Sequence, residues 1–504
     1  MSYNYRFIPE TMKYKNFRLT LLICILTVGS AAGQDGLYTI SLQGLGGYTT
    51  PDVVPFWLRA NQYGSVPLDG ASLSLTGSAR KEYDPGKGKL FDWGASFEGR
   101  ANLGQGSNMT LIEGYGKVRL GIFELRGGRS KKITGLCDTT LTSGSWAISG
   151  TNLGIPEVEL SVRDFWTLPW FGGLFAFKGN FSHGWMGDVQ MSRFILHDTL
   201  TLKSYLHQKS LYMRFGKPSW KVRFYGGFNH QVVWGSEQKY YLDDYTLTPV
   251  ETFLYVITGK KYSNGYIQEE RQGNHLGSID IGLEIAVAEL RIILYRQNLY
   301  EVGGLARLAN IQDGLNGLMI ENRLEKTGKT YWNKFLFEFL YTKNQAGRPW
   351  SPEYGSYYEP YYNHGQYLTG WSYGGTGLGS PFISTRSYLR DGLATHPDNF
   401  FVNNRVMVLH AGGEGRIENI DYVFKVSWSK NYGTYHTTDE EQSTGIPDPG
   451  SAGLFGERKQ FSAYLELNKM INEKIGAGII GAADFGELYY NSAGLFLRFT
   501  YHFR

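Results

Sequence analysis

The sequence predicts an all-β fold, a transmembrane barrel of antiparallel strands of the outer-membrane type. The prediction rests on three observations: an alternating apolar pattern, an export signal and an aromatic closing strand. The pattern is clearest near the end of the chain, where every second residue is apolar, namely Leu495, Leu497, Phe499, Tyr501 and Phe503. A period of two is that of a β-strand with one apolar and one polar face. In a barrel that crosses a membrane, the apolar face meets lipid and terminal aromatics lie in the interfacial girdle.

An export signal is predicted at residues 1–33. Lys13, Lys15 and Arg18 precede the apolar run from Leu19 to Val28, and small residues follow up to Gly33. This order of basic, apolar and small residues is typical of a secretory signal peptide. We therefore expect residues 34–504 to be exported to the bacterial outer membrane. Cys137 would then be the only cysteine of the mature chain, so no internal disulfide is expected.

The composition favours strands over helices and excludes several functional classes. The 504 residues include 65 glycines, 36 tyrosines and 29 phenylalanines, whereas charged residues make up only 19%. Abundant glycine and aromatic residues suit tight turns and the aromatic belts of a barrel. A formal net charge of +4 gives no basis for a nucleic-acid-binding surface. No apolar run approaches the ~20 residues that a membrane-spanning helix needs, so a membrane crossing would have to use strands.

Alternation recurs from about residue 71, in roughly 16 to 18 segments of about 9–12 residues, the length of a tilted membrane strand. Charged residues lie in mid-strand opposite the apolar face, as in residues 95–103, 175–182, 334–340 and 421–429. A soluble sandwich would show the same alternation, but soluble strands average only ~5–6 residues. The number and length of the segments therefore predict a single barrel domain from about residue 71. Residues 34–70 would form an N-terminal segment, in which Leu37–Leu45 could already be a strand.

Three long insertions interrupt the strand pattern, at about residues 236–274, 342–401 and 431–456. In outer-membrane barrels the long loops are extracellular, and the turns on the periplasmic side are short. The middle insertion is rich in aromatic residues, and we predict the following as polysaccharide-binding side chains: Trp350, Tyr354, Tyr357, Tyr358, Tyr361, Tyr362, Trp371 and Tyr373. Their rings could stack on the C–H faces of sugars. Alternatively, the insertion packs on itself or plugs the mouth of the barrel.

No catalytic or metal-binding motif stands out, and no cofactor or metal ion is expected. Residues 370–374 match the formal pattern of a nucleophile elbow, but they lie in a glycine- and tyrosine-rich loop and not between a strand and a helix. Zinc, calcium and phosphate-binding motifs are missing from the sequence. His183 would suit an outer-membrane lipid hydrolase only with a partner that the sequence does not indicate. We therefore predict a protein without enzymatic activity.

Several segments, taken together and in order, resemble the Bacteroidetes branch of the Wzi family of capsule-assembly proteins. They are Pro55–Gly64 with Phe56, Trp57, Arg59 and Asn61; Arg126–Arg129 with Ser143–Ser145; Ser182–Met186 with His183 and Trp185; and Asn403, Asn404, Arg405 and Val406 with Asn431–Tyr435. The resemblance implies an outer-membrane barrel of about 18 strands with long extracellular loops, which binds capsular polysaccharide and retains the capsule on the cell. It assigns no role to single residues. Enterobacterial members carry a helical bundle ahead of the barrel, whereas residues 34–70 are too few to build one.

We therefore expect a monomeric, non-enzymatic protein whose partners are capsular or other surface polysaccharide and outer-membrane lipid. Aromatic residues in long outward loops suit carbohydrate stacking, and the near-neutral charge of the chain fits a neutral or weakly charged glycan. The alternative is a channel for solute passage, because such a lumen would also be polar. The sequence leaves open whether the lumen is open or plugged.

Overall fold

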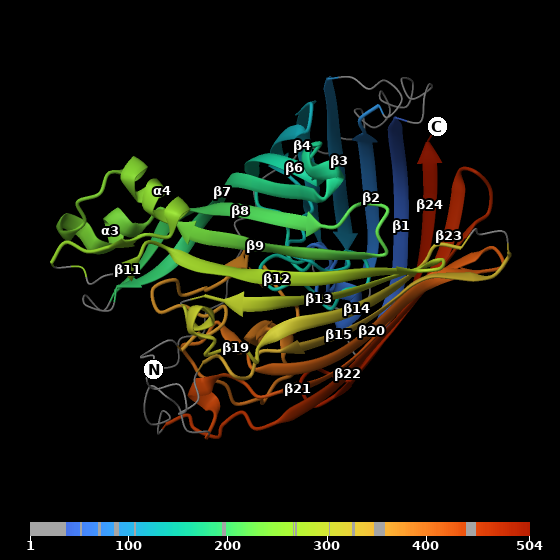
Figure 1. Cartoon of the computed structure of the whole chain (residues 1–504). Coiled ribbons are helices and arrows are strands. Elements are labelled where there is room, and N and C mark those ends of the chain that lie inside the picture. The colour runs from blue at the N-terminus through green and yellow to red at the C-terminus, as the bar shows by residue number, and fades with distance from the viewer. Residues whose placement is uncertain are drawn as a thin grey trace, which may run out of the picture.

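The computed structural model describes residues 37–503, except for residues 51–52, 69–71, 85–89, 105–106, 194–197, 266, 268–269, 302, 325–327, 347–357 and 440–449. The predicted signal peptide, residues 1–33, lies outside the described residues. Within them, an 18-stranded antiparallel sheet closes on itself (Figure 1). The structure thus confirms the predicted all-β barrel. The helices in the described part of the chain are all too short or too polar to cross a membrane.

The strands follow one another around the barrel in chain order. The first nine are β1 (Tyr38–Thr50), β2 (Ser72–Lys81), β3 (Phe91–Leu103), β4 (Asn108–Leu120), β5 (Phe123–Arg129), β6 (Glu157–Thr167), β7 (Phe175–Arg193), β8 (Asp198–Phe215) and β9 (Val222–Trp234). The other nine are β12 (Asn274–Val287), β13 (Leu290–Tyr300), β14 (Gly314–Asn322), β15 (Tyr331–Tyr341), β20 (Val406–Ile417), β21 (Ile420–Asn431), β22 (Arg458–Met470), β23 (Ile475–Gly486) and β24 (Ser492–Phe503).

The barrel closes where β1 pairs with β24, with Gly46 opposite Leu497. The strand expected at Leu37–Leu45 is β1, which also pairs with β2. The barrel therefore begins at Tyr38, and the expected start near residue 71 is wrong. Within residues 34–70, Tyr38–Thr50 form the first strand of the barrel, and the described residues 53–68 belong to the connection that follows it.

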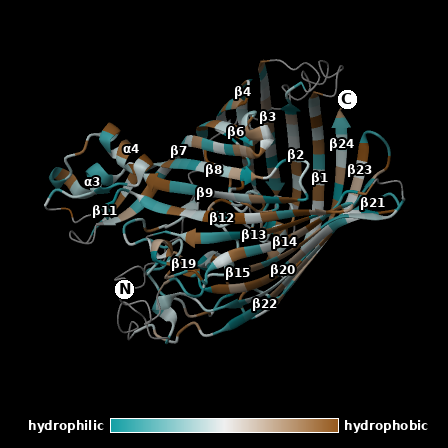
Figure 2. Cartoon of the chain, in the orientation of Figure 1, coloured by the Kyte–Doolittle hydropathy of each residue, from teal (hydrophilic) through white to brown (hydrophobic). Residues whose placement is uncertain are grey.

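Hydrophobic and hydrophilic residues follow one another in short bands along the strands (Figure 2), and the burial of their side chains shows that the two faces differ. On β24, Leu495 and Leu497 are 60% and 62% exposed, whereas Phe496 between them is only 4% exposed. The outward apolar side chains of other strands are also exposed; examples are Phe97, Leu211, Phe337 and Leu465. The charged mid-strand residues Arg100, Glu338 and Lys425 are buried inside. An apolar outer belt over a polar interior is the arrangement of a membrane-spanning barrel.

The connections alternate between the two ends of the barrel. At the end where β24 finishes they are short, such as residues 121–122 and 418–419. At the opposite end, which we call the mouth, the long ones are residues 51–71, 130–156, 235–273, 342–405 and 432–457. This agrees with the three insertions expected from the sequence and adds two more. Figure 1 shows α3 (Glu237–Tyr241) and α4 (Pro249–Thr258) beyond the ends of β7–β9, at the mouth.

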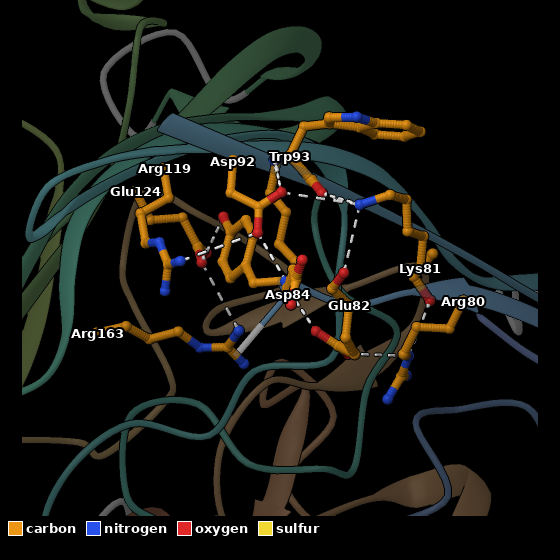
Figure 3. A network of polar contacts seen from close by, with 12 residues as sticks. Arg80, Lys81, Glu82, Asp84, Asp92, Trp93, Arg119, Glu124 and Arg163 are labelled. Atoms are coloured by element: carbon orange, nitrogen blue, oxygen red, sulfur yellow. Dashed lines mark hydrogen bonds and ion pairs between the residues drawn. The ribbon is translucent and has the colours of Figure 1, made fainter. Parts of the chain in front are cut away.

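Charged side chains of the lumen pair with one another at the end opposite the mouth (Figure 3). Lys81 Nζ and Arg119 Nη2 each lie 3.9 Å from an oxygen of Asp92. Arg163 Nη1 lies 3.9 Å from Glu124 Oε2, which also accepts a hydrogen bond from Tyr83. Ion pairs of this length contribute little to stability when they are hydrated. Their mixed signs nevertheless keep this part of the lumen polar without a large excess of either charge.

Candidate functional site

Three connections fold inward at the mouth, and we call their described parts, residues 53–68, 130–156 and 358–405, the plug. The plug supplies most of the largest fully buried side chains of the described chain, among them Trp57, Trp146, Tyr361, Tyr362, Trp371 and Phe401. They form two apolar clusters with inward residues of the strands. The described residues therefore fill the mouth with a packed core.

The first plug segment carries α2 (Phe56–Arg59), a single turn that follows Pro55. Its first amide, Phe56 N–H, donates to Asp484 Oδ2 on β23 at 2.7 Å, which satisfies one of the free N–H groups of a helix start. Trp57 Nε1 donates to Ser427 Oγ on β21 at 3.2 Å. The Phe56 ring lies 4.7 Å from that of Phe382 in the third segment. The helix thus joins the barrel wall to the rest of the plug.

The second plug segment is held by acidic residues of the wall. Glu338 on β15 accepts hydrogen bonds from Ser143 N–H at 2.6 Å and from Thr142 Oγ1 at 2.9 Å. Asp280 on β12 accepts one from Leu136 N–H at 2.7 Å. The sequence shows Glu338 as a charge in mid-strand, but its partners, a backbone amide and a hydroxyl, lie far away in the chain, which no local pattern reveals. Carboxylates that accept several such bonds are well satisfied although they are buried.

The third plug segment buries the aromatic residues that we predicted as sugar platforms. Tyr361, Tyr362 and Trp371 are at most 1% exposed. Tyr361 donates to Asp313 at 2.7 Å, and Trp371 Nε1 donates to Ala147 O in the second segment at 2.7 Å. These three rings are therefore inaccessible to a sugar. The sequence left open whether they stack on sugars or pack within the insertion, and in the structure they pack.

The other aromatic residues that we predicted to bind polysaccharide fall into two groups. Trp350, Tyr354 and Tyr357 lie outside the described residues. Tyr358 and Tyr373 are half-buried. Tyr358 lies 5.3 Å from the ring of Tyr435, and the hydroxyl of Tyr373 accepts a hydrogen bond from Arg129 at 3.1 Å. Neither ring stands as an isolated platform on the surface.

Most residues of the resemblance segments also have structural contacts. Asn403, Asn404 and Arg405 are at most 1% exposed, where the third segment returns to β20. Asn404 Nδ2 donates to Pro360 O at 2.8 Å, and the guanidinium of Arg405 lies 3.9 Å from the Tyr435 ring centroid. Asn61 Nδ2 donates to Thr142 O at 3.1 Å and so joins the first segment to the second.

His183 and Trp185 lie on the outer wall of β7, and not at the plug. The His183 ring is 5.7 Å from Phe253 of α4, which packs against this wall. The neighbouring hydroxyl, Ser182 Oγ, donates to Glu157 at 2.8 Å and so does not serve as a partner of His183. In the described part of the chain, no group of three or more His, Cys, Asp or Glu residues could hold a metal ion.

Burial changes the protonation of acidic residues in the third segment and in the connection between β13 and β14. It raises the pKa of Glu359 to about 7 from 4.5, although Gly303 and Gly304 N–H donate to its carboxylate. Burial also raises the pKa of Asp313 to about 6 and that of Glu301. The folded plug therefore binds more protons than the unfolded segment between pH ~4.5 and ~7.

We expect the plug to be less stable at pH 8 than at pH 5, because the three raised carboxyl pKa values give stability that is lost as the pH rises and together outweigh the opposite effect of the buried His364, whose pKa is lowered to about 4. The thermal midpoint, followed by tryptophan fluorescence, should be lower at pH 8. In Glu359→Gln the difference in thermal midpoint between pH 5 and pH 8 should shrink, since an amide does not titrate. The difference that remains should come from Asp313 and Glu301. A midpoint that rises from pH 5 to pH 8 would contradict the expectation.

An open cleft of about 190 Å³ lies at the mouth, between the first and third plug segments. Its walls include Arg59 at the end of α2, Tyr388 of the third segment, and Asn108 at the start of β4. The guanidinium carbon of Arg59 lies 4.3 Å from the centroid of the Tyr388 ring. Hydroxyls, an amide, an aromatic ring and a guanidinium in one open cleft can hold a polar ligand with an apolar face.

Two further cavities, of about 340 and 260 Å³, lie in the lumen below the second plug segment. Lys178 on β7 lines both. The larger one is also lined by Arg126, Lys132 and Glu159, which form ion pairs with one another. These cavities lie on the lumen side of the plug, whereas the cleft with Arg59 lies among the connections of the mouth.

No family model and no curated protein matches this sequence. Among solved structures, the chain is similar to Wzi of Escherichia coli, described as an outer-membrane protein involved in group 1 capsule assembly and as a carbohydrate-binding β-barrel. The identity is 11% and the TM-score 0.52, over 96% of this chain and 87% of that one.

Two further solved structures are also similar. OccAB2 of Acinetobacter baumannii has 10% identity and a TM-score of 0.44, over 93% of this chain and 99% of that one. OprD of Pseudomonas aeruginosa has 10% identity and a TM-score of 0.43, over 94% and 95%. At such identities a likeness shows the fold alone. The chain therefore has the fold of an 18-stranded outer-membrane β-barrel.

Proposed function

We propose that the protein is a non-conducting outer-membrane barrel that binds capsular or other surface polysaccharide at its mouth and anchors it to the cell. The observation that supports this most is the packed plug, because solute passage needs a continuous aqueous path through the lumen. Trp146 of the second segment contacts Tyr361 and Tyr362 of the third, each at 4.7 Å between ring centroids. The fold likeness to Wzi, a carbohydrate-binding barrel, supports the choice of ligand.

We also propose where the protein lies in the cell and in which oligomeric state it acts. The apolar outer belt fits lipid, and the signal peptide proposed at residues 1–33 would direct export. With its short turns in the periplasm, the barrel presents the mouth and the cleft with Arg59 to the outside. We further propose that it acts as a monomer and without catalysis.

Deletion of the gene tests the anchor directly. We expect a deletion strain to release polysaccharide into the medium while the total amount made stays constant, because only attachment is lost. Cell-bound and released polysaccharide are measured separately, and the wild-type gene supplied in trans should restore retention. Unchanged retention in the deletion strain would contradict the anchor function.

Conductance separates the anchor from the channel alternative. We expect the purified protein to give no stable conductance steps in a planar bilayer, because the described plug segments pack into two apolar clusters at the mouth. A variant that lacks residues 361–400 should conduct once it has inserted, which shows that the assay detects an open barrel. Regular conductance steps from the wild-type protein would favour the channel.

A further inference from the structure

Arg59 is held in place by aromatic rings and not by carboxylates. Its guanidinium carbon lies 4.3 Å from the ring centroid of Tyr388, 5.3 Å from that of Tyr489 and 5.5 Å from that of Phe56. It forms no ion pair and no hydrogen bond with any described residue. The side chain is half-buried, so its position is fixed while part of it still meets solvent.

Among the described residues, no acceptor takes up the hydrogen-bonding capacity of Arg59. A guanidinium carries five N–H donors in one plane, and stacking on rings occupies its faces and not its edges. The nearby carboxylate of Asp484 accepts from Phe56 N–H at 2.7 Å through Oδ2; it interacts with Arg59 electrostatically but forms no ion pair with it. Arginine edges match a carboxylate with two parallel hydrogen bonds, which are stronger than bonds between neutral groups.

The described lining of the cleft carries a positive charge. Among the described residues that line it, Arg59 alone is charged. The rest offer hydroxyls and an amide, as at Ser387, Thr151 and Asn108, or apolar surface, as at Val66 and Ile383. Polar groups of this kind suit the hydroxyls of a sugar, and the apolar ones suit its C–H face. A volume of about 190 Å³ admits a sugar ring, with the rest of the chain leaving through the open side.

We propose that this cleft binds a sugar acid of the polysaccharide, with the carboxylate on the edge of Arg59. The inference rests on the proposed function and specifies its ligand as an acidic glycan. It departs from the neutral or weakly charged glycan that the net charge of the chain suggests. Net charge sums the paired lumen residues as well, whereas recognition depends on the unpaired charge in the cleft.

The test compares one glycan in two charge states. Purified full-length protein in detergent is titrated with polygalacturonate oligosaccharides and with their methyl-esterified, uncharged form, and binding is followed by calorimetry. We expect the acid form to bind about 10–100-fold more tightly, because a charge-assisted bidentate contact contributes binding energy of that size. The preference should fall as the salt concentration rises, because the contact is electrostatic.

Arg59→Met should abolish the preference for the acid form and leave binding of the ester unchanged, while Arg59→Lys should retain part of it. Arg386→Met is the matched control, since Arg386 also lies at the mouth but donates to His396 O at 3.0 Å. Heat-modified gel mobility confirms that each variant is folded. If Arg59→Met fails to fold, the comparison of acid and ester on the wild-type protein still decides.

Equal wild-type binding of both forms would overturn the acidic ligand but leave polysaccharide binding intact. An equal loss in Arg386→Met would also overturn it, because general charge at the mouth would then be responsible. Binding of neither form would overturn the inference, and together with unchanged capsule retention in the deletion strain it would also remove the proposed function.

Discussion

Replacing Trp371 by alanine is expected to destabilise the plug by about 3–5 kcal/mol, the usual cost of removing a buried tryptophan. Trp371 is 0% exposed, and its Nε1 donates to Ala147 O at 2.7 Å. The substitution leaves a cavity between the second and third plug segments and a buried carbonyl without its donor. The strands keep their ladder partners, so we expect the mouth to open while the barrel remains folded. Hydrogen exchange of residues 130–156 should rise, and conductance steps should appear in planar bilayers.

Trp170→Ala provides the control for this result. Trp170 is 64% exposed in the turn between β6 and β7, at the end opposite the mouth. The same change of side chain should shift stability by less than about 0.5 kcal/mol, because no buried contact is lost. Similar effects of the two substitutions would contradict the packed plug.

The strands could be predicted from the sequence because their signal is local. Phe97 and Leu465 are exposed on the outside, while Arg100 and Glu338 are buried inside, as the alternation indicates. Two neighbouring residues on a strand point to opposite faces, so a window of ten residues already contains the information. Three of the five long connections could be predicted for the same reason, since the alternation stops where they begin.

The plug could not be predicted because its contacts join distant parts of the chain. Trp371 meets Ala147 across 224 positions, and Tyr362 meets Trp146 across 216. Tyrosine, tryptophan and glycine give the same composition to an exposed binding loop and to a packed one, so the burial of these rings has no local signal. The inward folding of residues 130–156 could not be predicted either, because the residues that hold this segment are acidic residues of the wall such as Glu338.

The segments that resemble the Wzi family contain residues that hold the plug and a residue that lines the open cleft. Phe56, Trp57, Asn404 and Arg405 are engaged in the plug, which gives them a structural role. Arg59 belongs to the same run of sequence but turns toward the open cleft. A sequence pattern marks such residues together, and only the three-dimensional contacts separate those that hold the plug from Arg59, which lines the open cleft.

Leu497→Arg is expected to lower the stability of the barrel in lipid by about 2–4 kcal/mol. Leu497 lies in the middle of β24 and is 62% exposed, so in a soluble protein the same change would be almost neutral. The cost arises only if this face meets the hydrocarbon core of a membrane. Urea titration of the protein folded into lipid vesicles measures it, with Thr500→Arg as control, because Thr500 lies on the opposite face of the strand. A neutral Leu497→Arg would mean that the apolar belt does not face lipid, and the outer-membrane location would fail with it.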